Sequence, residues 1–489
     1  MKLLLIVPNY HCGGMEAIQG PLMNLGPLFI ASAAVKNGHE VKYLDLTIDN
    51  IKYNECDSIF DLYSPDIIGV AARTHLVSEA IRVIHYCKQR NPKLLTLMGG
   101  IHATFMFQEI MSHHIEVDYI LRYECEETLT LLLDALEKGD DLSQIPNLVW
   151  RKDDIVVNDM AQEVTDVNKY RPAYELIPDW NKYRNHFTGD LSAVVQFSRG
   201  CVQKCSYCSQ WKFWNSWHSC SPKVFADEIE MLYKTYGIRY FLLADEAPQI
   251  DSELWEEVLN EIISKKLKGA YFATCARVKD VQRDKNIMSK YRAAGFMIIL
   301  FGAEFTNNKT LNDVAKEQKF EEIHDAIQLV KVNGMIAMVD IMLGWNNDES
   351  EFFQTLREVP NLNADFICYF WTTPYPWTKS FNELTERYNL DGNYENYNFM
   401  TFFGNSSNQR SLEKELIKFY FWYHFKIKHI YNGFFTGSKM RRRIFRSIYF
   451  QGLIKSIVQI FPIMSSIIHQ NKTVVNSMYY GSDKKSWSL

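Results

Sequence analysis

The chain has 489 residues, of which 47% are hydrophobic, 23% charged and 14% aromatic, and its formal net charge is -5. This composition excludes an intrinsically disordered chain, a collagen-like repeat and a small disulfide-rich scaffold. The charge is uneven, because residues 409–489 hold 14 Lys and Arg against 3 Asp and Glu, which gives this tail +11 and leaves the first 408 residues with -16.

The first 145 residues alternate between short apolar runs and longer segments of helical periodicity. We expect strands at 2–7, 41–46, 67–71, 94–98 and 119–122, and helices at 28–37, 77–89 and 127–137. This alternation predicts a doubly wound parallel sheet, a Rossmann-like domain. Ligands bind such a sheet beyond the carboxyl ends of its strands, where Gly13-Gly14, Thr74-His75 and Gly99-Gly100 lie. Residues 1–145 are therefore expected to bind a cofactor.

Residues 146–190 contain three prolines and mixed charge, which predicts an irregular connector. Alternation resumes after it, with strands expected at 193–197, 240–244, 269–274, 297–301, 337–343 and 366–370 and helices such as 222–236 and 320–333. Six strands with intervening helices predict a partial or complete βα barrel over residues 191–408. The predicted fold class is thus α/β, followed by a basic, aromatic, helical region at 409–489.

The basic tail has two readings. Arg441, Arg442 and Arg443 can belong to a solvated helical face, or to a surface that contacts an acidic membrane or an acidic planar ligand. No motif of a nucleic-acid-binding module accompanies them, so we expect no nucleic-acid partner. The apolar run at residues 1–8 is shorter than a signal peptide core or a membrane span, and we expect a reducing, cytoplasmic compartment.

One dense group of cysteines stands out, Cys201, Cys205 and Cys208, directly after the strand expected at 193–197. Three thiolates within eight residues can surround one metal centre, and a 4Fe-4S cluster bound in this way keeps one iron open for another ligand. Structural zinc is an alternative, with His218 or Cys220 as a fourth ligand. Chance clustering of inert cysteines is the remaining alternative.

The spacing of these cysteines, with Tyr207 just before the last one, resembles the signature of radical S-adenosylmethionine (SAM) enzymes. The resemblance implies that the three cysteines hold a 4Fe-4S cluster whose open iron binds SAM, that reduction yields a 5′-deoxyadenosyl radical, and that Tyr207 lies near the adenine. It also implies catalytic roles at strand ends for Asp245 and Glu246, for Arg277 and for Glu304, and an adenine-binding segment that ends at Gly344. Each of these charged residues, taken alone, can equally be a solvated or paired surface charge.

Several segments of the first domain resemble cobalamin-binding domains fused to radical SAM enzymes. Gly99 to Thr104 and Arg122 to Thr128 carry this resemblance, although Gly-Gly can also be a plain turn and the histidines ordinary polar residues. The Asp-x-His-x-x-Gly motif that supplies a cobalt ligand elsewhere is absent, so the lower face of the cobalt is unassigned. The residues predicted to bind the cofactor are Asn9, Tyr10, His11, Gly13, Gly14, Thr74, His75, Gly99, Gly100, His102, Arg122, Glu124 and, for SAM, Gly344.

Two longer runs, Pro8 to Gly14 and Cys205 to Trp214, together with Leu243 to Pro248 and Tyr375 to Trp377, resemble the anaerobic magnesium-protoporphyrin IX monomethyl ester oxidative cyclase family. Cys12 departs from that pattern, where the family has a serine. The resemblance implies a porphyrin substrate, fifth-ring closure with oxygen from water, and a flavodoxin or ferredoxin-type electron donor. The candidate flat walls for a macrocycle are Trp211, Phe213, Trp214, Trp217, Phe370, Trp371, Tyr375 and Trp377, with tail arginines to neutralise a propionate.

Two further functions share these features. A cobalamin-dependent radical SAM methyltransferase acting on an unactivated carbon would use every one of the same cofactors. A non-catalytic sensor that binds a cluster and a corrin is the third alternative, and no signalling module accompanies the two domains in the sequence.

Overall fold

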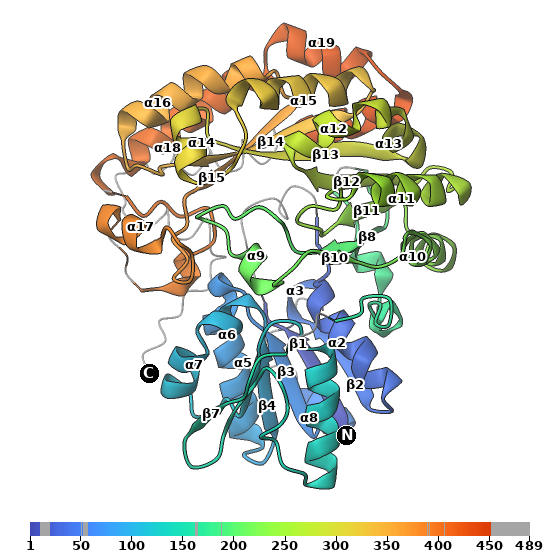
Figure 1. Cartoon of the computed structure of the whole chain (residues 1–489), viewed down its shortest axis with the longest axis vertical. Helices are drawn as coiled ribbons and strands as arrows, with labels where there is room; N and C mark the ends of the chain where they lie inside the picture. Colours follow the sequence, from blue (N-terminus) through green and yellow to red (C-terminus); the bar gives the residue numbers. More distant parts are fainter. Residues whose placement is uncertain are drawn as a thin grey trace.

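The computed structural model describes residues 1–9, 20–49, 51, 57–161, 165–186, 188–388, 390, 392–404 and 406–450. Two sheets organise these residues, one in an amino-terminal domain and one in a barrel, and the short helix α9 (Gln210–Phe213) lies between them (Figure 1). The predicted α/β fold class is therefore confirmed.

The amino-terminal sheet has seven strands in the order β2-β1-β3-β4-β5-β6-β7. The strands are β1 (Lys2–Val7), β2 (Glu40–Asp45), β3 (Ile67–Ala71), β4 (Leu95–Gly99), β5 (Tyr119–Leu121), β6 (Leu148–Arg151) and β7 (Ile155–Val157). The first five are parallel, and each of the five predicted strands is present within two residues. Leu3, Leu4, Leu5 and Ile6 are buried on both faces of the sheet, as the continuous apolar run predicts.

The predicted connector contributes to this sheet, which corrects the expectation that it is irregular throughout. β6 pairs antiparallel with β5, and β7 pairs antiparallel with β6. The Lys152 amide donates to the Asp154 carbonyl across the tight turn between them, at 3.1 Å. The signal was present in the sequence as two short apolar runs, residues 148–150 and 155–157, on either side of the polar residues 151–154.

Helices cover both faces of the amino-terminal sheet (Figure 1). They are α2 (Leu25–Lys36), α3 (Leu46–Asp49), α4 (Asp57–Tyr63), α5 (Val77–Arg90), α6 (Ile101–Phe105), α7 (Phe107–His113) and α8 (Glu126–Lys138), with the 3-10 turns η2 (Thr74–Leu76), η3 (Tyr174–Leu176) and η4 (Trp180–Lys182). α8 ends at Gly139, whose φ of +75° is the left-handed conformation that glycine adopts without strain.

The second sheet has six parallel strands in the order β15-β14-β13-β12-β11-β8, a partial (βα)6 barrel. The strands are β8 (Ser192–Val195), β11 (Tyr240–Leu243), β12 (Tyr271–Ala276), β13 (Phe296–Glu304), β14 (Ile336–Leu343) and β15 (Phe366–Trp371), and the pair β9 (Ser198–Arg199) and β10 (His218–Ser219) follows β8. All six predicted strands are present, and most of their apolar residues are buried.

The barrel helices pack on the outer face of this sheet (Figure 1). They are α10 (Pro222–Thr235), α11 (Ser252–Ser264), α12 (Val278–Arg283), α13 (Met288–Ala294), α14 (Asn308–Asp313), α15 (Phe320–Val332) and α16 (Glu349–Glu358), with η5 (Asp284–Asn286) and η6 (Val359–Leu362). α17 (Phe381–Arg387) follows the last strand, and η7 (Tyr394–Asn396) contacts η2 and α5 of the amino-terminal domain. α10 begins where the Ser221 hydroxyl accepts the Val224 amide at 3.3 Å and Pro222 occupies the first turn.

The tail closes the amino-terminal end of the barrel. Its described part consists of α18 (Ser406–His424), α19 (Ile427–Phe435) and the helical residues 439–450, whereas residues 451–489 of the predicted helical tail lie outside the described residues. Ile444, Phe445 and Ile448 are buried against the inner face of the sheet, where they contact the first halves of the strands. In the part of the chain that the structure describes, no helix is long and apolar enough to span a membrane.

Candidate functional site

The cysteine loop lies at the carboxyl end of the first barrel strand. Gly200 turns the chain into the loop with φ of +87°, and a Cβ there would lie 2.4 Å from the Ser216 carbonyl oxygen. Cys205 is buried, whereas Cys201 and Cys208 are half-buried. Burial raises the pKa of all three thiols, that of Cys208 to about 12, so binding of a metal cluster must displace their protons. Three thiols on one loop fit a cluster that takes three protein ligands.

Two carboxylates, the buried Asp245 and the half-buried Glu246, hold the chain just before this loop. Asp245 accepts the Phe197 amide at 3.1 Å, the Ser198 hydroxyl at 2.7 Å and the Ser198 amide at 2.5 Å. Burial raises the pKa of Asp245 to about 7. Both of its oxygens are thus used by the backbone and by a hydroxyl, so Asp245 has the geometry of a positioning residue, and its catalytic role stays a prediction.

Glu246 has a similar role one residue further along the chain. It accepts the Gly200 amide at 3.2 Å and the Trp214 indole N–H at 2.8 Å. Burial raises the pKa of its carboxyl as well. Asp245 and Glu246, the predicted catalytic pair, therefore lie next to the cysteine loop. Their hydrogen bonds fix the residues that lead into the loop and the region of α9 that follows it.

A cation that the sequence reasoning missed lies beside the cysteines. Lys316 donates to Glu304 at 3.0 Å, and its ammonium group interacts electrostatically with Cys205 and Cys208. Glu304 adopts a left-handed backbone with φ of +63°, a strained conformation for a residue with a side chain. Gly302 makes room for this pair, because a Cβ there would lie 2.9 Å from Lys316 Nζ. The Glu304–Lys316 pair is neutral overall, and it holds its ammonium group beside the cysteines that would bind an anionic cluster.

Arg277 also lies near the loop, because its guanidinium interacts electrostatically with Cys201. Its main partner is Asp280, to which it donates twice, at 2.6 and 2.7 Å. A bidentate pair of this kind fixes the orientation of the guanidinium. The predicted catalytic role of Arg277 stays a prediction.

Asp340, Cys275 and Cys368 form a polar layer inside the barrel that the sequence did not indicate. In the sheet register Asp340 lies opposite Gly302 on β13 and Cys368 on β15. Oδ1 of Asp340 is buried with no hydrogen-bond partner within the described ranges, and burial raises the pKa of this carboxyl to about 7. Cys275 is exposed although it lies on a central strand, which shows that solvent reaches this face of the sheet.

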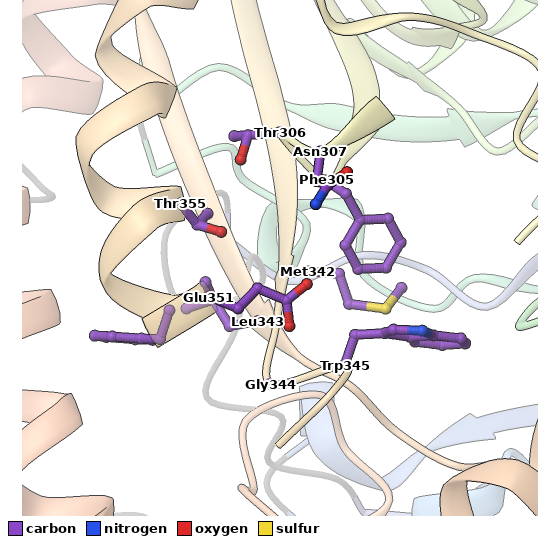
Figure 2. Close-up of a pocket in the computed structure, with 10 residues that line it drawn as sticks. Phe305, Thr306, Asn307, Met342, Leu343, Gly344, Trp345, Glu351 and Thr355 are labelled. Atoms are coloured by element: carbon purple, nitrogen blue, oxygen red, sulfur yellow. The ribbon is translucent and has the colours of Figure 1, made fainter. Parts of the chain in front are cut away.

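The segment predicted to bind adenine borders a pocket at the carboxyl ends of β13 and β14 (Figure 2). Gly344 has φ of +80° and leads from β14 to Trp345. Tyr207 of the cysteine loop packs edge-on against Trp345, with ring centroids 6.3 Å apart. The structure thus brings together Tyr207 and the Gly344 segment, which are far apart in the sequence. The residues that line the pocket are Phe305, Thr306, Asn307, Met342, Leu343, Gly344, Trp345, Glu351, Phe352 and Thr355.

The carboxyl ends of the amino-terminal strands bring together most of the other predicted cofactor residues. Gly100 has φ of +99°, and a Cβ there would lie 2.9 Å from the Ala72 carbonyl oxygen. Thr74 and His102 are buried, and burial lowers the pKa of His75 to about 4 and that of His102 to about 3. The imidazoles are therefore neutral and fit an apolar face of a large ligand. Asn9 lies two residues after the end of β1, whereas Tyr10, His11, Cys12, Gly13 and Gly14 lie outside the described residues.

Arg122 and Glu124 both have protein partners. Arg122 donates to the Asn158 carbonyl at 3.0 Å and lies over the Phe107 ring. Glu124 accepts the Thr165 amide at 2.7 Å and lies 2.8 Å from His218 Nε2. These contacts direct Glu124 toward the barrel, so its predicted contact with a cofactor stays without support from the geometry.

A buried ion-pair cluster joins the two domains beside the cysteine loop. Arg199, two residues before Cys201, lies 2.6 Å from Glu126 at the start of α8 and 3.7 Å from Glu124. His218 on β10 completes it through Glu124. The side chains of Arg199 and Glu126 are 3% and 4% exposed. Since His218 has this partner and Cys220 lies in the barrel core, neither is positioned as a fourth zinc ligand.

Arg441 does not belong to the anion-binding surface that we considered. Arg441 is buried and lies 2.9 Å from Asp365, whose other oxygen accepts the Ala337 amide at 3.0 Å. Arg443 donates to the Thr188 carbonyl at 2.7 Å. Arg441 therefore fastens the tail to the barrel, and membrane contact by the tail stays a prediction.

The candidate aromatic walls divide into two groups. Phe213 and Trp371 are 9% and 7% exposed, and Trp214 and Trp217 donate to Glu246 and to the Ala247 carbonyl. These four are structural residues of the barrel. Trp211, Phe370, Tyr375 and Trp377 are half-buried and lie on the side that faces the amino-terminal domain or the barrel mouth.

Two family models match the chain. A B12 binding domain matches residues 13–133, and the radical SAM superfamily matches residues 195–359. The chain is 30% identical over 408 residues to the anaerobic magnesium-protoporphyrin IX monomethyl ester cyclase of Rubrivivax gelatinosus, which covers 82% of this chain and 73% of that protein. It is 26% identical over 385 residues to an uncharacterized methyltransferase of Pyrococcus horikoshii, covering 78% and 82%.

Solved structures share the fold. The cobalamin-dependent SAM radical enzyme OxsB aligns with a TM-score of 0.70 and 16% identity over 98% of this chain and 76% of that chain. The radical SAM methyltransferase TsrM of Kitasatospora setae aligns with a TM-score of 0.65 and 19% identity over 79% of this chain and 76% of that chain. The two matched domains bind cobalamin and, in the barrel, a 4Fe-4S cluster with SAM.

Proposed function

Because the chain belongs to the cobalamin-binding radical SAM enzymes that include the anaerobic magnesium-protoporphyrin IX monomethyl ester cyclases, we propose that it catalyses this cyclase reaction on a porphyrin monomethyl ester. The observation that carries the proposal is the 30% identity over 408 residues, which extends through both domains. As part of the proposal, an electron donor of the flavodoxin or ferredoxin type supplies the cluster in a reducing, cytoplasmic compartment.

The bound cofactors supply a 5′-deoxyadenosyl radical by reductive cleavage of SAM, and the protein's own residues arrange the site. In this proposal Cys201, Cys205 and Cys208 hold the cluster, and Asp245 and Glu246 fix the loop that carries them. The Lys316 ammonium, paired to Glu304 at 3.0 Å, offsets part of the negative charge that three thiolates bring.

Asp340 is the residue best placed to accept a proton inside the barrel. In the proposed reaction the ketone oxygen comes from water, and its transfer to carbon releases the two protons of that water molecule. A carboxyl group whose pKa is about 7 is half ionised at neutral pH, which suits a general base. Its buried Oδ1 has no hydrogen-bond partner among the described residues, and the exposed Cys275 lies on the same sheet.

The test is an anaerobic assay of the reconstituted enzyme with magnesium-protoporphyrin IX monomethyl ester, SAM and a reductant. We expect a ring-closed product by mass spectrometry together with 5′-deoxyadenosine. Release of 5′-deoxyadenosine without any ring-closed porphyrin would show that the substrate assignment is wrong.

A methyltransferase is the second candidate, because the Pyrococcus horikoshii relative that carries that name matches 78% of this chain. It would use the same cofactors and the same cysteine loop. The co-products separate the two reactions: a methylated product with S-adenosylhomocysteine indicates methyl transfer, whereas a cyclase forms none. The third alternative, a sensor without turnover, is not supported, since the chain belongs to a family of enzymes.

A further inference from the structure

A stripe of aromatic side chains runs from the barrel mouth to the amino-terminal domain. Phe370 on β15 contacts Phe399 with ring centroids 6.2 Å apart, and Phe399 contacts Tyr375 at 5.8 Å. Tyr375 stacks on Trp377 at 5.5 Å, and Trp377 stacks on Phe105 of α6 at 5.3 Å. These five residues, the aromatic stripe, form one continuous set of rings across both domains.

Phe399 is held in an unusual conformation within the stripe. Its φ is +64°, in the left-handed region that disfavours a bulky side chain, and the Trp371 amide donates to its carbonyl at 2.8 Å. Its side chain is nevertheless 41% exposed. A strained backbone that presents an exposed aromatic ring is typical of a ligand contact.

Three lysines lie at the end of this stripe, around the ring of Trp211. The ammonium groups of Lys379, Lys212 and Lys204 are 4.9, 5.4 and 6.0 Å from the ring centroid. Lys212 also donates to the Trp377 carbonyl at 3.0 Å, which joins this lysine cluster to the aromatic stripe.

The lysine cluster consists of hydrogen-bond donors without an anionic acceptor. None of its three ammonium groups pairs with a carboxylate of the described residues, and the indole N–H of Trp211 is buried without an acceptor there. Lys204 and Lys379 are exposed, so an anion can reach them from solvent. The first 408 residues carry a net charge of -16, which makes three converging lysines without counter-charges a local exception.

We propose that the lysine cluster binds the free carboxylate of the substrate while the aromatic stripe supports its flat face. The inference rests on the proposed function, because a porphyrin monomethyl ester is planar and apolar and retains one free propionate. Cations at one end and aromatic faces along the rest match such a ligand. The esterified side chain then extends toward the barrel mouth at Phe370, and the free propionate stays at the outer end beside Trp211.

The test compares two porphyrins that differ in one charge. Magnesium-protoporphyrin IX monomethyl ester and the corresponding dimethyl ester are titrated into the anaerobically reconstituted holoenzyme without reductant, and the Kd is read from porphyrin fluorescence. We expect the wild-type enzyme to bind the monoester about tenfold more tightly than the diester, with a preference that weakens at high salt.

Lys204→Ala combined with Lys379→Ala removes the two exposed charges and leaves the Lys212 contact to Trp377 intact. We expect this variant to bind the monoester about tenfold more weakly, which corresponds to about 1.4 kcal/mol, and to bind the diester as the wild type does, because the two removed charges face only the free carboxylate. Lys379→Arg should retain most of the affinity. Lys285→Ala, an exposed lysine on η5 outside the site, is the matched control and should change neither Kd.

Equal affinity of the wild-type enzyme for the two esters, or an unchanged monoester Kd in the double variant, would overturn the inference. A second result would also overturn it: a double variant that binds the monoester as tightly as the wild type does, and that cleaves SAM slowly with a flavodoxin as electron donor but at the normal rate with dithionite. That result would identify the cluster as a docking surface for an acidic electron donor. Charge-dependent binding without any ring-closed product, in contrast, would refute only the proposed reaction.

Discussion

Arg199→Met is the sharpest test of how the two domains are joined. Arg199 donates to Glu126 at 2.6 Å and to Gln196 at 3.2 Å, and its guanidinium lies over the Phe29 ring at 4.4 Å. Methionine has a similar length and is apolar, so it can keep much of the contact with Phe29. The variant therefore removes the charge from the interface and leaves Glu126 buried without its partner.

The expected loss of stability depends on how deeply the ion pair is buried. A second ion pair in the same chain has the same distance between its charged atoms and serves as the comparison. Lys234 lies 2.6 Å from Glu230 on the surface of α10, and its side chain is 66% exposed, against 3% for Arg199. Removing one partner of a buried pair costs about 3–5 kcal/mol, since an unpaired carboxylate is left in a medium of low polarity. Removing one partner of an exposed pair costs about 0–1 kcal/mol.

The free energies of unfolding of the apoprotein variants are compared by urea titration, followed by tryptophan fluorescence. We expect Arg199→Met to lower the value by about 3–5 kcal/mol and Lys234→Met, the control, by less than about 1 kcal/mol. Adding Glu126→Gln to Arg199→Met should recover part of the loss. If Arg199→Met and Lys234→Met are equally stable, or if the second substitution recovers nothing, burial does not set the strength of this pair.

Three further changes test other parts of the structure. Cys205→Ala should abolish cluster iron while cobalamin still binds, and an unchanged iron content would contradict the ligand assignment. Arg441→Met should lower the free energy of unfolding by about 3 kcal/mol, because Asp365 stays buried; a loss below about 1 kcal/mol would show that the tail is not held by this pair. For Asp340, burial raises the pKa of the carboxyl in the folded protein to about 7. Between the pKa of the unfolded chain and pH 7, the folded protein therefore keeps a proton that the unfolded chain has released. The free energy of unfolding falls as the pH rises through this range. Between pH 5 and pH 8 the wild type should therefore lose about 2–3 kcal/mol relative to Asp340→Asn in the same urea titration, and a constant difference would refute the raised pKa.

The sequence was sufficient for the features that depend on local pattern. The barrel strands were predicted from apolar runs, and β14 begins at Ile336 where 337 was expected. The cysteine loop was predicted from spacing alone, since all three thiols come from one segment of chain. The hairpin of β6 and β7 was missed because its strands are short and the prolines around it suggested an irregular segment.

The rest of the site depends on contacts between distant segments. Lys316 and Asp340 come from a loop and from mid-strand, and neither belongs to a motif. Their functions depend on the sheet register, which places Asp340 opposite Gly302 and Cys368. Asp245 was found from its position after a strand, but its partners Phe197 and Ser198 lie almost fifty residues away in the sequence. Its position at the end of a strand therefore located Asp245 without showing whether this residue touches a ligand or supports the loop.

The cysteine loop and the amino-terminal domain are not independent structures. Arg122 and Tyr123 belong to the cofactor edge of that domain, and the next few residues supply Glu124 and Glu126 to Arg199. Arg199 in turn precedes Gly200, whose tight turn starts the loop and whose amide is held by Glu246. A short chain of buried polar contacts thus fixes where the cluster ligands begin relative to the corrin-binding edge. An enzyme that uses both cofactors on one substrate needs this distance to be constant, because a displacement of about 1 Å in a reacting geometry can lower the rate about a hundredfold.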